Sequence, residues 1–412
     1  MERPLYPYQT KPGDFMRQAK KMDFLLIAAF LLTVLIPFHR VSAEELWITL
    51  SNDFYNLIIN DVPVLSKLDN HSKERSLLKI DDKYVDTLSY LKHKNPKIGG
   101  FIAHYDYKEG KEYLEKDFTA ITQQKVSYTI GEEQLVNALI AQVKEENIIE
   151  TISTLAAFHN RYYKSTTGAD AANWIKNKWL TLSQGKSGVT VEEFRHRFTQ
   201  PSIILTITGS TTASEVIVIG GHEDSIAGSW GGSTAKAPGA DDNASGIAVI
   251  TEMIRVMMVN NYVPKKSIKF IAYAAEEAGL LGSKDVAADF KKRSIKVSGV
   301  MQLDMTNYKG SANDIYLIGD YTNKTQNEYI GQLIDKYVKV PWGYSTCGYG
   351  CSDHASWSAS GFAASFPFEA TFSGANPDIH TARDTLETSG GRADHSVKFA
   401  KLAIAYAIEM AK

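Results

Sequence analysis

The alternation of apolar and polar positions along the chain predicts helices first and then strands that alternate with helices. Apolar residues recur at every third or fourth position over residues 148–158 and 169–182, which is the spacing of amphipathic helices. Runs of β-branched residues at 203–207 and 216–219 predict strands, and a helical pattern covers residues 246–259. These segments indicate an α/β region.

Two further strand patterns, at residues 267–274 and 300–303, and a helical pattern at residues 394–411 continue this region. Because strands and helices alternate, we expect a mostly parallel mixed sheet sandwiched between helices. No internal repeat or low-complexity tract interrupts the pattern. We therefore expect one large α/β domain over residues 121–412.

The segment before the α/β region has a different composition. Residues 44–120 are rich in lysine and acidic residues, show weak periodicity, and include the basic run at residues 92–97. These features favour a prosegment that is removed from the mature protein. A small structural subdomain that stays attached is the alternative.

The first 43 residues have the pattern of a signal peptide. Basic residues precede an uncharged apolar run from Phe24 to Phe38, which is shorter than the ~20 residues that a spanning helix needs. Small residues at 41–43 stand where signal peptidase would cut, so we expect export and cleavage before Glu44. An uncleaved membrane anchor is the alternative, and both options place the rest of the chain outside the cytoplasm.

The 412-residue chain has an ordinary globular composition, with a formal net charge of -2 and 44% hydrophobic residues. It has no dense block of lysine and arginine, and phosphate binding needs clustered positive charge. We therefore expect no nucleic-acid partner.

The two cysteines, Cys347 and Cys351, lie four residues apart with two glycines between them. The glycines let the backbone fold tightly enough to bring the sulfurs together, and an exported protein would oxidise them. Free thiols or half of a metal site are the alternatives, but no second cysteine cluster completes a thiolate site. We expect a local disulfide.

Polar residues that could carry chemistry follow the predicted strands. The strand at 216–219 runs through two glycines into His222, Glu223 and Asp224. In an extended backbone His222 and Asp224 point to one side and Glu223 to the other. One of the two grouped residues can bind a metal while the other orients it. Taken alone, however, a histidine at a strand end is more often structural.

Two adjacent carboxylates, Asp241 and Asp242, precede the helical pattern at 246–259. Crowded like charges are tolerated beside a cation or at a helix N-terminus. An ordinary helix cap explains this motif as well as a metal ligand does. The glycosylation sequon at Asn243 overlaps the motif, but we expect its neighbours to be buried and catalytic and therefore discount it.

The strand pattern at 267–274 is followed by Glu276 and Glu277. Adjacent residues that leave a strand point apart, so one carboxylate can face a metal while the other faces a water as general base. A solvated glutamate pair is the alternative interpretation. The position of the pair directly after a core strand favours chemistry.

Asp304 follows the strand pattern at 300–303, and His380 lies in a predicted loop without an evident packing role. In open parallel sheets, ligands bind beyond the carboxyl ends of the strands. Two histidines and three carboxylates there suit a pair of zinc ions with one bridging carboxylate. Such paired metals activate a water and polarise a carbonyl.

Five segments closely resemble the secreted bacterial leucyl aminopeptidases, a family of di-zinc metallopeptidases. They are residues 220–225, 238–246, 272–279, 302–308 and 347–357. The resemblance runs from about Ile121 to the C-terminus. It implies the phosphorylase/hydrolase-like fold of zinc-dependent exopeptidases, as a single catalytic domain that carries a removable N-terminal prosegment.

The resemblance also implies which residues hold two zinc ions per subunit. They are His222, Asp242, Glu277, Asp304 and His380. Asp242 is implied as the bridging carboxylate because the family's ligand lies three residues before the serine of a Ser-Gly pair, here Ser245 and Gly246.

The remaining catalytic roles are implied in the same way. Glu276 would be the general base on the water that bridges the zinc ions, and Asp224 would be the acid behind His222. Glu223 departs from the family, which more often has an apolar residue there. Because Glu223 points away from His222, we expect no lost ligand.

The implied activity is hydrolysis of the N-terminal peptide bond, with a preference for leucine or other hydrophobic residues. The implied pocket for that side chain consists of Met305, Tyr349, Cys351, Phe368, Phe372 and Ile379. Plain core packing is the alternative role for these residues. We expect peptides with a free N-terminus as partners, a monomer, and no stable membrane association after signal cleavage.

Two other functions compete with this one. A single-zinc glutaminyl cyclase on a similar fold would differ in zinc content and in product mass. A non-catalytic binding ectodomain would usually lack metal ligands, whereas all five are present here together with Glu276.

Overall fold

The computed structural model describes residues 45–68, 74–95, 98–123 and 127–412. The predicted signal peptide, residues 1–43, and its cleavage site before Glu44 lie outside the described residues. Among the residues that are described, no helix is both long and apolar enough to cross a membrane.

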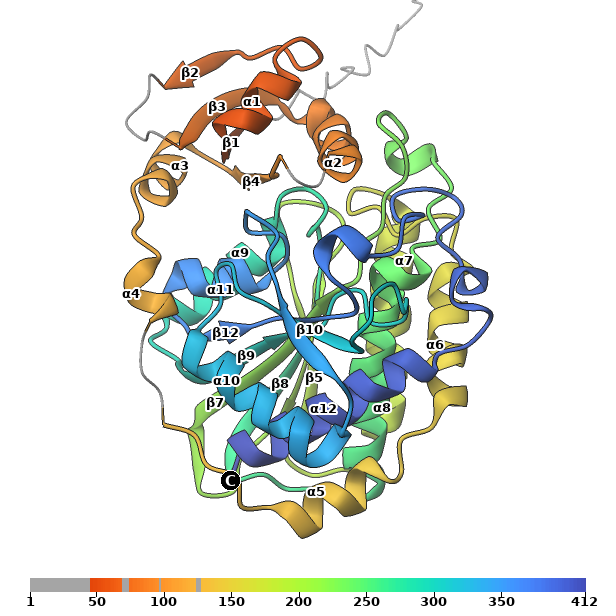
Figure 1. The fold of residues 1–412 in the computed structure, drawn as a ribbon. Coiled ribbons are helices and arrows are strands. Elements are labelled where there is room, and N and C mark those ends of the chain that lie inside the picture. The colour runs from red at the N-terminus through yellow and green to blue at the C-terminus, as the bar shows by residue number, and fades with distance from the viewer. Residues whose placement is uncertain (1–44, 69–73, 96–97, 124–126) are drawn as a thin grey trace, which may run out of the picture. The chain divides into compact units, whose positions relative to one another are not determined.

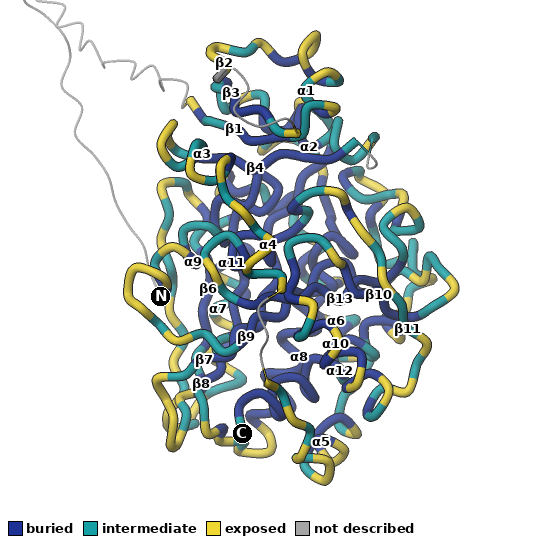
Figure 2. Tube along the Cα trace, turned by 60° about the vertical axis from the view of Figure 1, so that its left-hand side comes forward, coloured by how far each residue is buried: buried dark blue, intermediate teal, exposed yellow. Residues whose placement is uncertain are grey.

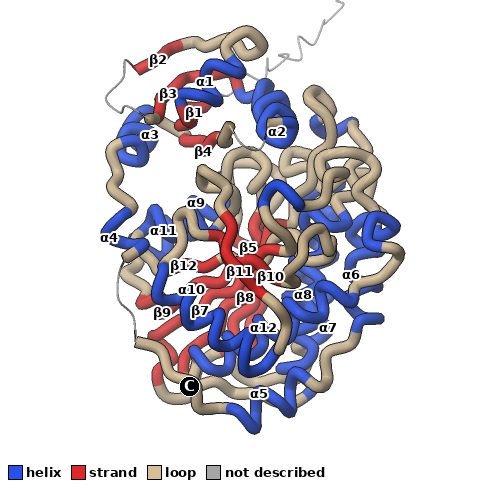
Figure 3. The backbone as a smooth tube through the Cα atoms, viewed as in Figure 1, coloured by secondary structure: helices blue, strands red, loops and turns tan. Residues whose placement is uncertain are grey.

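Six strands form the central sheet, in the order β12-β9-β7-β8-β6-β5 (Figures 1 and 3). Their bounds are β5 (Val189–Phe194), β6 (Ser202–Ile207), β7 (Thr212–His222), β8 (Lys266–Tyr273), β9 (Lys296–Gln302) and β12 (Ala364–Ser365). β7 pairs in parallel with β8 and β9, and β12 pairs in parallel with β9. β6 pairs antiparallel with both β8 and β5. The expected mostly parallel mixed sheet is confirmed.

Alternate side chains of β7 are buried on opposite faces of the sheet, as the two-residue period of a strand requires. Ile217 and Ile219 belong to a large apolar cluster with one set of helices, and Val216 and Val218 belong to a second cluster with another set. Figure 2 shows the central strands as part of the buried interior.

The helices that flank the sheet fall into two groups by these clusters. The first contains α5 (Glu133–Ile140), α6 (Glu145–Ala156), α7 (Thr166–Leu182), α8 (Gly246–Val259), α10 (Lys324–Leu333) and α12 (Asp394–Met410). The second contains α9 (Leu281–Lys292) and α11 (His354–Ser360). A small sheet of β11 (Trp342–Ser345), β10 (Ile315–Ile318) and β13 (Pro367–Phe368) completes this part of the chain.

Residues 45–118 form what we call the N-terminal subdomain, whose sheet has the order β2-β3-β1-β4. Its elements are β1 (Glu45–Ser51), α1 (Asn52–Ile58), β2 (Ser66–Leu68), β3 (Arg75–Asp81), α2 (Val85–Lys94), β4 (Phe101–His104) and α3 (Tyr107–Leu114), and α4 (Thr119–Thr122) follows. The strand and helix order is a split β-α-β arrangement. Its apolar core also includes Ala275, Ala278 and Leu281, so it packs directly on the α/β domain.

Candidate metal centre

The candidate metal ligands come from five separate places in the chain and meet beyond the carboxyl ends of the parallel strands. His222 ends β7, Glu277 follows β8, and Asp304 follows β9. Asp242 lies in the turn before α8, and His380 lies in a loop near the C-terminus. All five side chains are buried.

Asp242 lies between the two histidines. Its Oδ1 is 3.0 Å from His222 Nε2, and its Oδ2 is 3.1 Å from His380 Nε2. His222 Nε2 is also 3.4 Å from Asp304 Oδ1, and His380 Nε2 is 2.9 Å from Glu277 Oε1. The residues therefore form two groups that could each hold a metal ion, and both groups share Asp242.

The electrostatics of both groups suit cations. Burial alone would lower the pKa of His222, but the carboxylates of Asp304, Asp224 and Asp242 raise it well above its usual range. Burial opposes the charge of His380 too, yet Glu277 and Asp242 raise its pKa to about 10. A zinc ion is an alternative source of the positive charge that these carboxylates favour.

Two carboxylates of the site also have oxygens that accept no regular hydrogen bond from the described residues. Glu277 Oε2 is buried and accepts no hydrogen bond from any residue that the structure describes, while Glu277 Oε1 and Asp304 Oδ1 lie near the histidine nitrogens without a hydrogen bond of regular geometry. Buried polar atoms without a hydrogen-bond partner are rare in native proteins, and a bound metal ion is one explanation. The donor set of imidazole nitrogen and carboxylate oxygen fits zinc.

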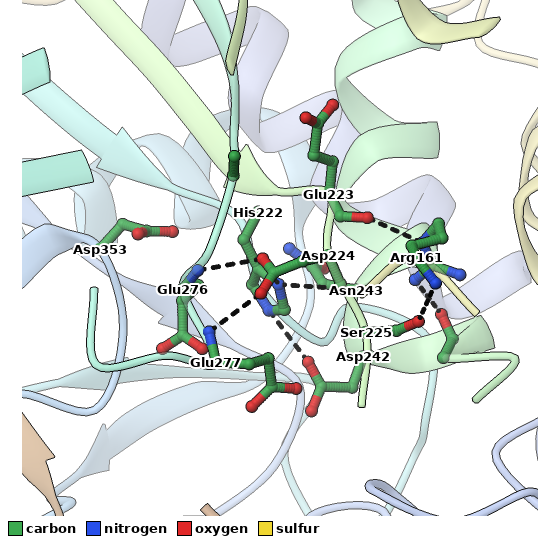
Figure 4. Close-up of polar contacts among 12 residues, drawn as sticks. Arg161, His222, Glu223, Asp224, Ser225, Asp242, Asn243, Glu276, Glu277 and Asp353 are labelled. Atoms are coloured by element: carbon green, nitrogen blue, oxygen red, sulfur yellow. Dashed lines mark hydrogen bonds and ion pairs between the residues drawn. The ribbon is translucent and has the colours of Figure 1, made fainter. Parts of the chain in front are cut away.

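Asp224 links His222 to the glutamate pair (Figure 4). Its Oδ1 is 3.3 Å from His222 Nδ1 and accepts a hydrogen bond from the Glu276 amide at 3.0 Å. Its Oδ2 accepts one from the Glu277 amide at 3.1 Å. One carboxylate thus orients both a candidate ligand and the turn that carries the candidate base.

The neighbouring Glu223 points away from His222, as the extended backbone predicts (Figure 4). Its carboxylate is fully buried, and this burial raises its pKa well above the usual range. Arg161 donates from Nε to the Glu223 carbonyl oxygen at 2.8 Å, which fixes the backbone behind the site.

Asp241 does not lie with its neighbour Asp242 in either metal group. Asp241 Oδ1 accepts a hydrogen bond from the Asn307 amide at 3.0 Å. The carboxylate of Asp384 accepts hydrogen bonds from the backbone amides of both Asp241 and Asp242, each at 3.1 Å. Asp384 therefore fixes the backbone that presents Asp242, and no motif in the sequence pointed to it.

Two further polar residues support Asp304. Ser352 donates from Oγ to Asp304 Oδ2 at 2.5 Å, and Gln302 donates from Nε2 to Ser352 Oγ at 3.1 Å. Gln302 Nε2 also donates to Asp353 Oδ2 at 2.8 Å, and burial raises the pKa of Asp353 to about 7. The only sequence signal for Ser352 and Asp353 was their place in the segment 347–357.

A cavity of about 350 Å³ opens beside the metal groups. All six residues of the implied side-chain pocket line it: Met305, Tyr349, Cys351, Phe368, Phe372 and Ile379. Glu276 also lines it, so the candidate base and the apolar pocket face one space. Cys347 and Cys351 form a disulfide at this edge, as expected from the sequence.

The N-terminal subdomain also contributes to this cavity, through Lys92, His93 and Lys94 at the end of α2. The rings of His93 and His380 have centroids 5.2 Å apart. Ser89, also in α2, donates from Oγ to the carbonyl oxygen of Glu277 at 2.6 Å. No residue of this segment was predicted from the sequence to belong to the site.

Lys92 brings a positive charge to the carboxylates. Burial alone would lower its pKa, but Tyr349 and the carboxylates of Glu276, Glu277 and Asp242 raise it above its usual value. The carboxylates therefore attract the ammonium group as well as the two histidines.

The fold and the site define a metal-dependent hydrolase, and comparisons with known proteins give its family. The profile described as Peptidase family M28 matches residues 202–405. Leucine aminopeptidase 1 of the fungus Arthroderma gypseum is 37% identical over 315 residues, covering 72% of this chain and 83% of that protein.

Two solved structures agree with this result. The LapA aminopeptidase of Legionella pneumophila has a TM-score of 0.79 and 33% identity, and the match covers 90% of this chain and 99% of that one. LapB of the same organism has a TM-score of 0.77 and 34% identity, with 89% and 100% covered. The chain belongs to peptidase family M28. It is a zinc-dependent metalloaminopeptidase that acts on peptides with a free N-terminus.

Proposed function

We propose that the protein is a secreted two-zinc aminopeptidase that removes leucine and other hydrophobic residues from peptides. The observation that carries this proposal is that the two oxygens of Asp242 face different histidines. His222 and Asp304 would hold one ion with Asp242, and Glu277 and His380 would hold the other. Bound zinc supplies Lewis-acid stabilisation of the scissile carbonyl and lowers the pKa of water.

Glu276 is the proposed general base. Asp224 holds the amides of Glu276 and Glu277, and the two glutamate side chains leave the turn in different directions (Figure 4). Burial raises the pKa of Glu276 well above its usual range, so its carboxylate binds a proton more readily than an exposed glutamate does. Glu276 takes a proton from the attacking water and delivers it to the leaving nitrogen as the C–N bond breaks.

The apolar side of the cavity is the proposed binding site for the first side chain of the substrate. Met305 and Phe368 are buried there, and the rings of Phe368 and Phe372 lie 6.1 Å apart. A branched aliphatic side chain gains ~25 cal/mol per Å² of apolar surface that it buries in such a pocket. This supports a preference for leucine over small or charged residues.

We propose that the signal peptide spans residues 1–43, the prosegment 44–120 and the catalytic domain 121–412. Three observations support an inhibitory prosegment: Lys92 to Lys94 line the cavity, Ser89 binds Glu277, and Gly100 packs so closely on Tyr349 that an added Cβ would lie 2.4 Å from that ring. The precursor would then be a zymogen, and the mature enzyme a secreted monomer.

A single-zinc glutaminyl cyclase, the alternative function, would need only one of the two metal groups. The second group, formed by Asp242, Glu277 and His380, favours the hydrolase. A non-catalytic ectodomain is disfavoured because Glu276 is also present beside the metal groups.

The test of the catalytic proposal compares the parent enzyme with Glu276→Gln. We expect the parent to release leucine from a free peptide but not from its N-acetylated form. Glu276→Gln should keep the parent's zinc content and fold and lose about 100- to 10,000-fold in kcat, since a general base supplies roughly 10²–10⁴-fold. Substantial activity in Glu276→Gln would exclude its role as base.

The test of the prosegment measures activity before and after limited proteolysis, together with N-terminal sequencing. Activity should rise as the new N-terminus moves to about residue 120. Fully active enzyme that begins only at Glu44 would reject the zymogen proposal.

A further inference from the structure

A second polar cluster lies beside the turn that carries Glu276, and no candidate metal ligand belongs to it. Ser202, the first residue of β6, has its Oγ 2.8 Å from His196 Nε2. His196 Nδ1 lies 2.8 Å from Asp285 Oδ2 in α9. Ser202 Oγ also accepts a hydrogen bond from the Ala274 amide at 3.0 Å.

The order serine, histidine, aspartate is that of a nucleophilic triad, but this site cannot act as one. Ser202 is fully buried, and so is the side chain of His196. The Ser202 oxygen already binds the Ala274 amide, so no substrate carbonyl can reach it. The cluster therefore does not act on a substrate, and its role is to hold other parts of the protein in place.

The hydrogen bonds of the cluster form a chain with one consistent direction. The Ala274 amide donates to Ser202 Oγ, so the single hydroxyl proton of Ser202 is free to donate to His196 Nε2. The Nδ1–H tautomer of His196 then donates to Asp285. Tyr105 of the N-terminal subdomain donates to the same Asp285 oxygen at 3.1 Å.

The chain of hydrogen bonds ends at an unusual stretch of backbone. Ala275, the residue between Ala274 and Glu276, has a φ of +55°, in the left-handed region that non-glycine residues seldom adopt. Such a conformation persists only where the surroundings fix it. Ser202 fixes the amide before Ala275, and Asp224 fixes the two amides after it.

We propose that Ser202 is a positioning residue for Glu276, acting through the Ala274 amide, and that His196 and Asp285 orient the Ser202 hydroxyl. This inference rests on the proposed role of Glu276 as general base. Without the hydroxyl, the Ala274 amide loses its acceptor and the strained turn can relax. The Glu276 carboxylate then moves relative to the substrate, whereas the Glu277 carboxylate is still held beside His380, whose Nε2 lies 2.9 Å from Glu277 Oε1.

The test compares Ser202→Ala with a matched control, Thr251→Val. Thr251 in α8 is also buried and accepts a hydrogen bond from Trp179 Nε1 at 3.0 Å. Both variants are made as the full chain and processed like the parent. Steady-state kinetics on a leucine substrate gives kcat and KM separately, and zinc content is measured for each variant.

Ser202→Ala should lower kcat by about 10- to 100-fold, because small misplacements of a catalytic group cost up to roughly 100-fold in rate. KM and zinc content should stay within twofold of the parent, and Thr251→Val should keep the parent's kcat. Ser202→Thr, which restores a hydroxyl, should recover most of kcat. If Ser202→Ala does not fold, His196→Gln provides the second variant, with an expected fall in kcat at unchanged KM.

An unchanged kcat in Ser202→Ala, or in His196→Gln, would overturn the inference. An equal fall in Thr251→Val would also do so. Glu276→Gln separates this failure from failure of the proposed function. If Glu276→Gln is inactive while Ser202→Ala is fully active, only the positioning role is wrong, whereas an active Glu276→Gln removes the basis of both.

Discussion

Replacing Ser352 by alanine should weaken one of the two candidate metal groups and leave the other intact. Ser352 Oγ donates to Asp304 Oδ2 at 2.5 Å, and both residues are buried. A hydrogen bond to a charged group is worth ~1.5–3 kcal/mol, and ~1.4 kcal/mol is a factor of ten in affinity. The zinc affinity of the group that contains Asp304 should therefore fall by about 10- to 100-fold.

The assay is a titration in which a chromophoric chelator competes for zinc with the parent and with Ser352→Ala. Ser365→Ala is the matched control, because Ser365 is also fully buried and accepts a hydrogen bond from Gln326 Nε2 at 3.0 Å. The parent should show two zinc affinities, of which Ser352→Ala changes one. Unchanged affinities in Ser352→Ala, or an equal loss at both sites, would refute this account of Asp304.

Two further predictions concern stability and substrate binding. The double substitution Cys347→Ser and Cys351→Ser should lower the free energy of unfolding by about 2 kcal/mol, as expected for a short loop, in thermal unfolding. It should also raise KM for leucine substrates, because Tyr349 between the cysteines lines the cavity; an unchanged KM would argue against Tyr349 in the pocket. Burial, reinforced by Lys284, lowers the pKa of His104 from 6.5 to about 4. The unfolded chain therefore binds this proton near pH 6.5, whereas the folded chain binds it only near pH 4. The free energy of unfolding should fall by up to roughly 3 kcal/mol as the pH falls from 6.5 through 4. The hydrogen-exchange protection factors of β4, which are corrected for the intrinsic pH dependence of exchange, should fall over that range in the parent and fall less in His104→Gln.

Much of the α/β domain follows from local patterns. The helical pattern at 246–259 coincides with α8, and the strand patterns at 203–207 and 216–219 lie within β6 and β7. The positions of His222, Glu277 and Asp304 were predictable together, because the parallel strands β7, β8 and β9 end at one edge of the sheet.

The sequence could not show contacts that depend on how distant segments pack. The antiparallel pairing of β6 with β8 places Ser202 beside Ala274, 72 residues away, and no local pattern encodes that pairing. The weak periodicity of residues 44–120 reflects short elements, such as the three-residue β2. Lys92 lies near the carboxylates only because α2 packs against the α/β domain.

Anomalous scattering at the zinc absorption edge, recorded from crystals of the enzyme, can show whether two zinc ions share Asp242. We expect two peaks ~3.5–4 Å apart, one beside each oxygen of Asp242. A single peak, or two peaks of which only one contacts Asp242, would exclude a shared Asp242.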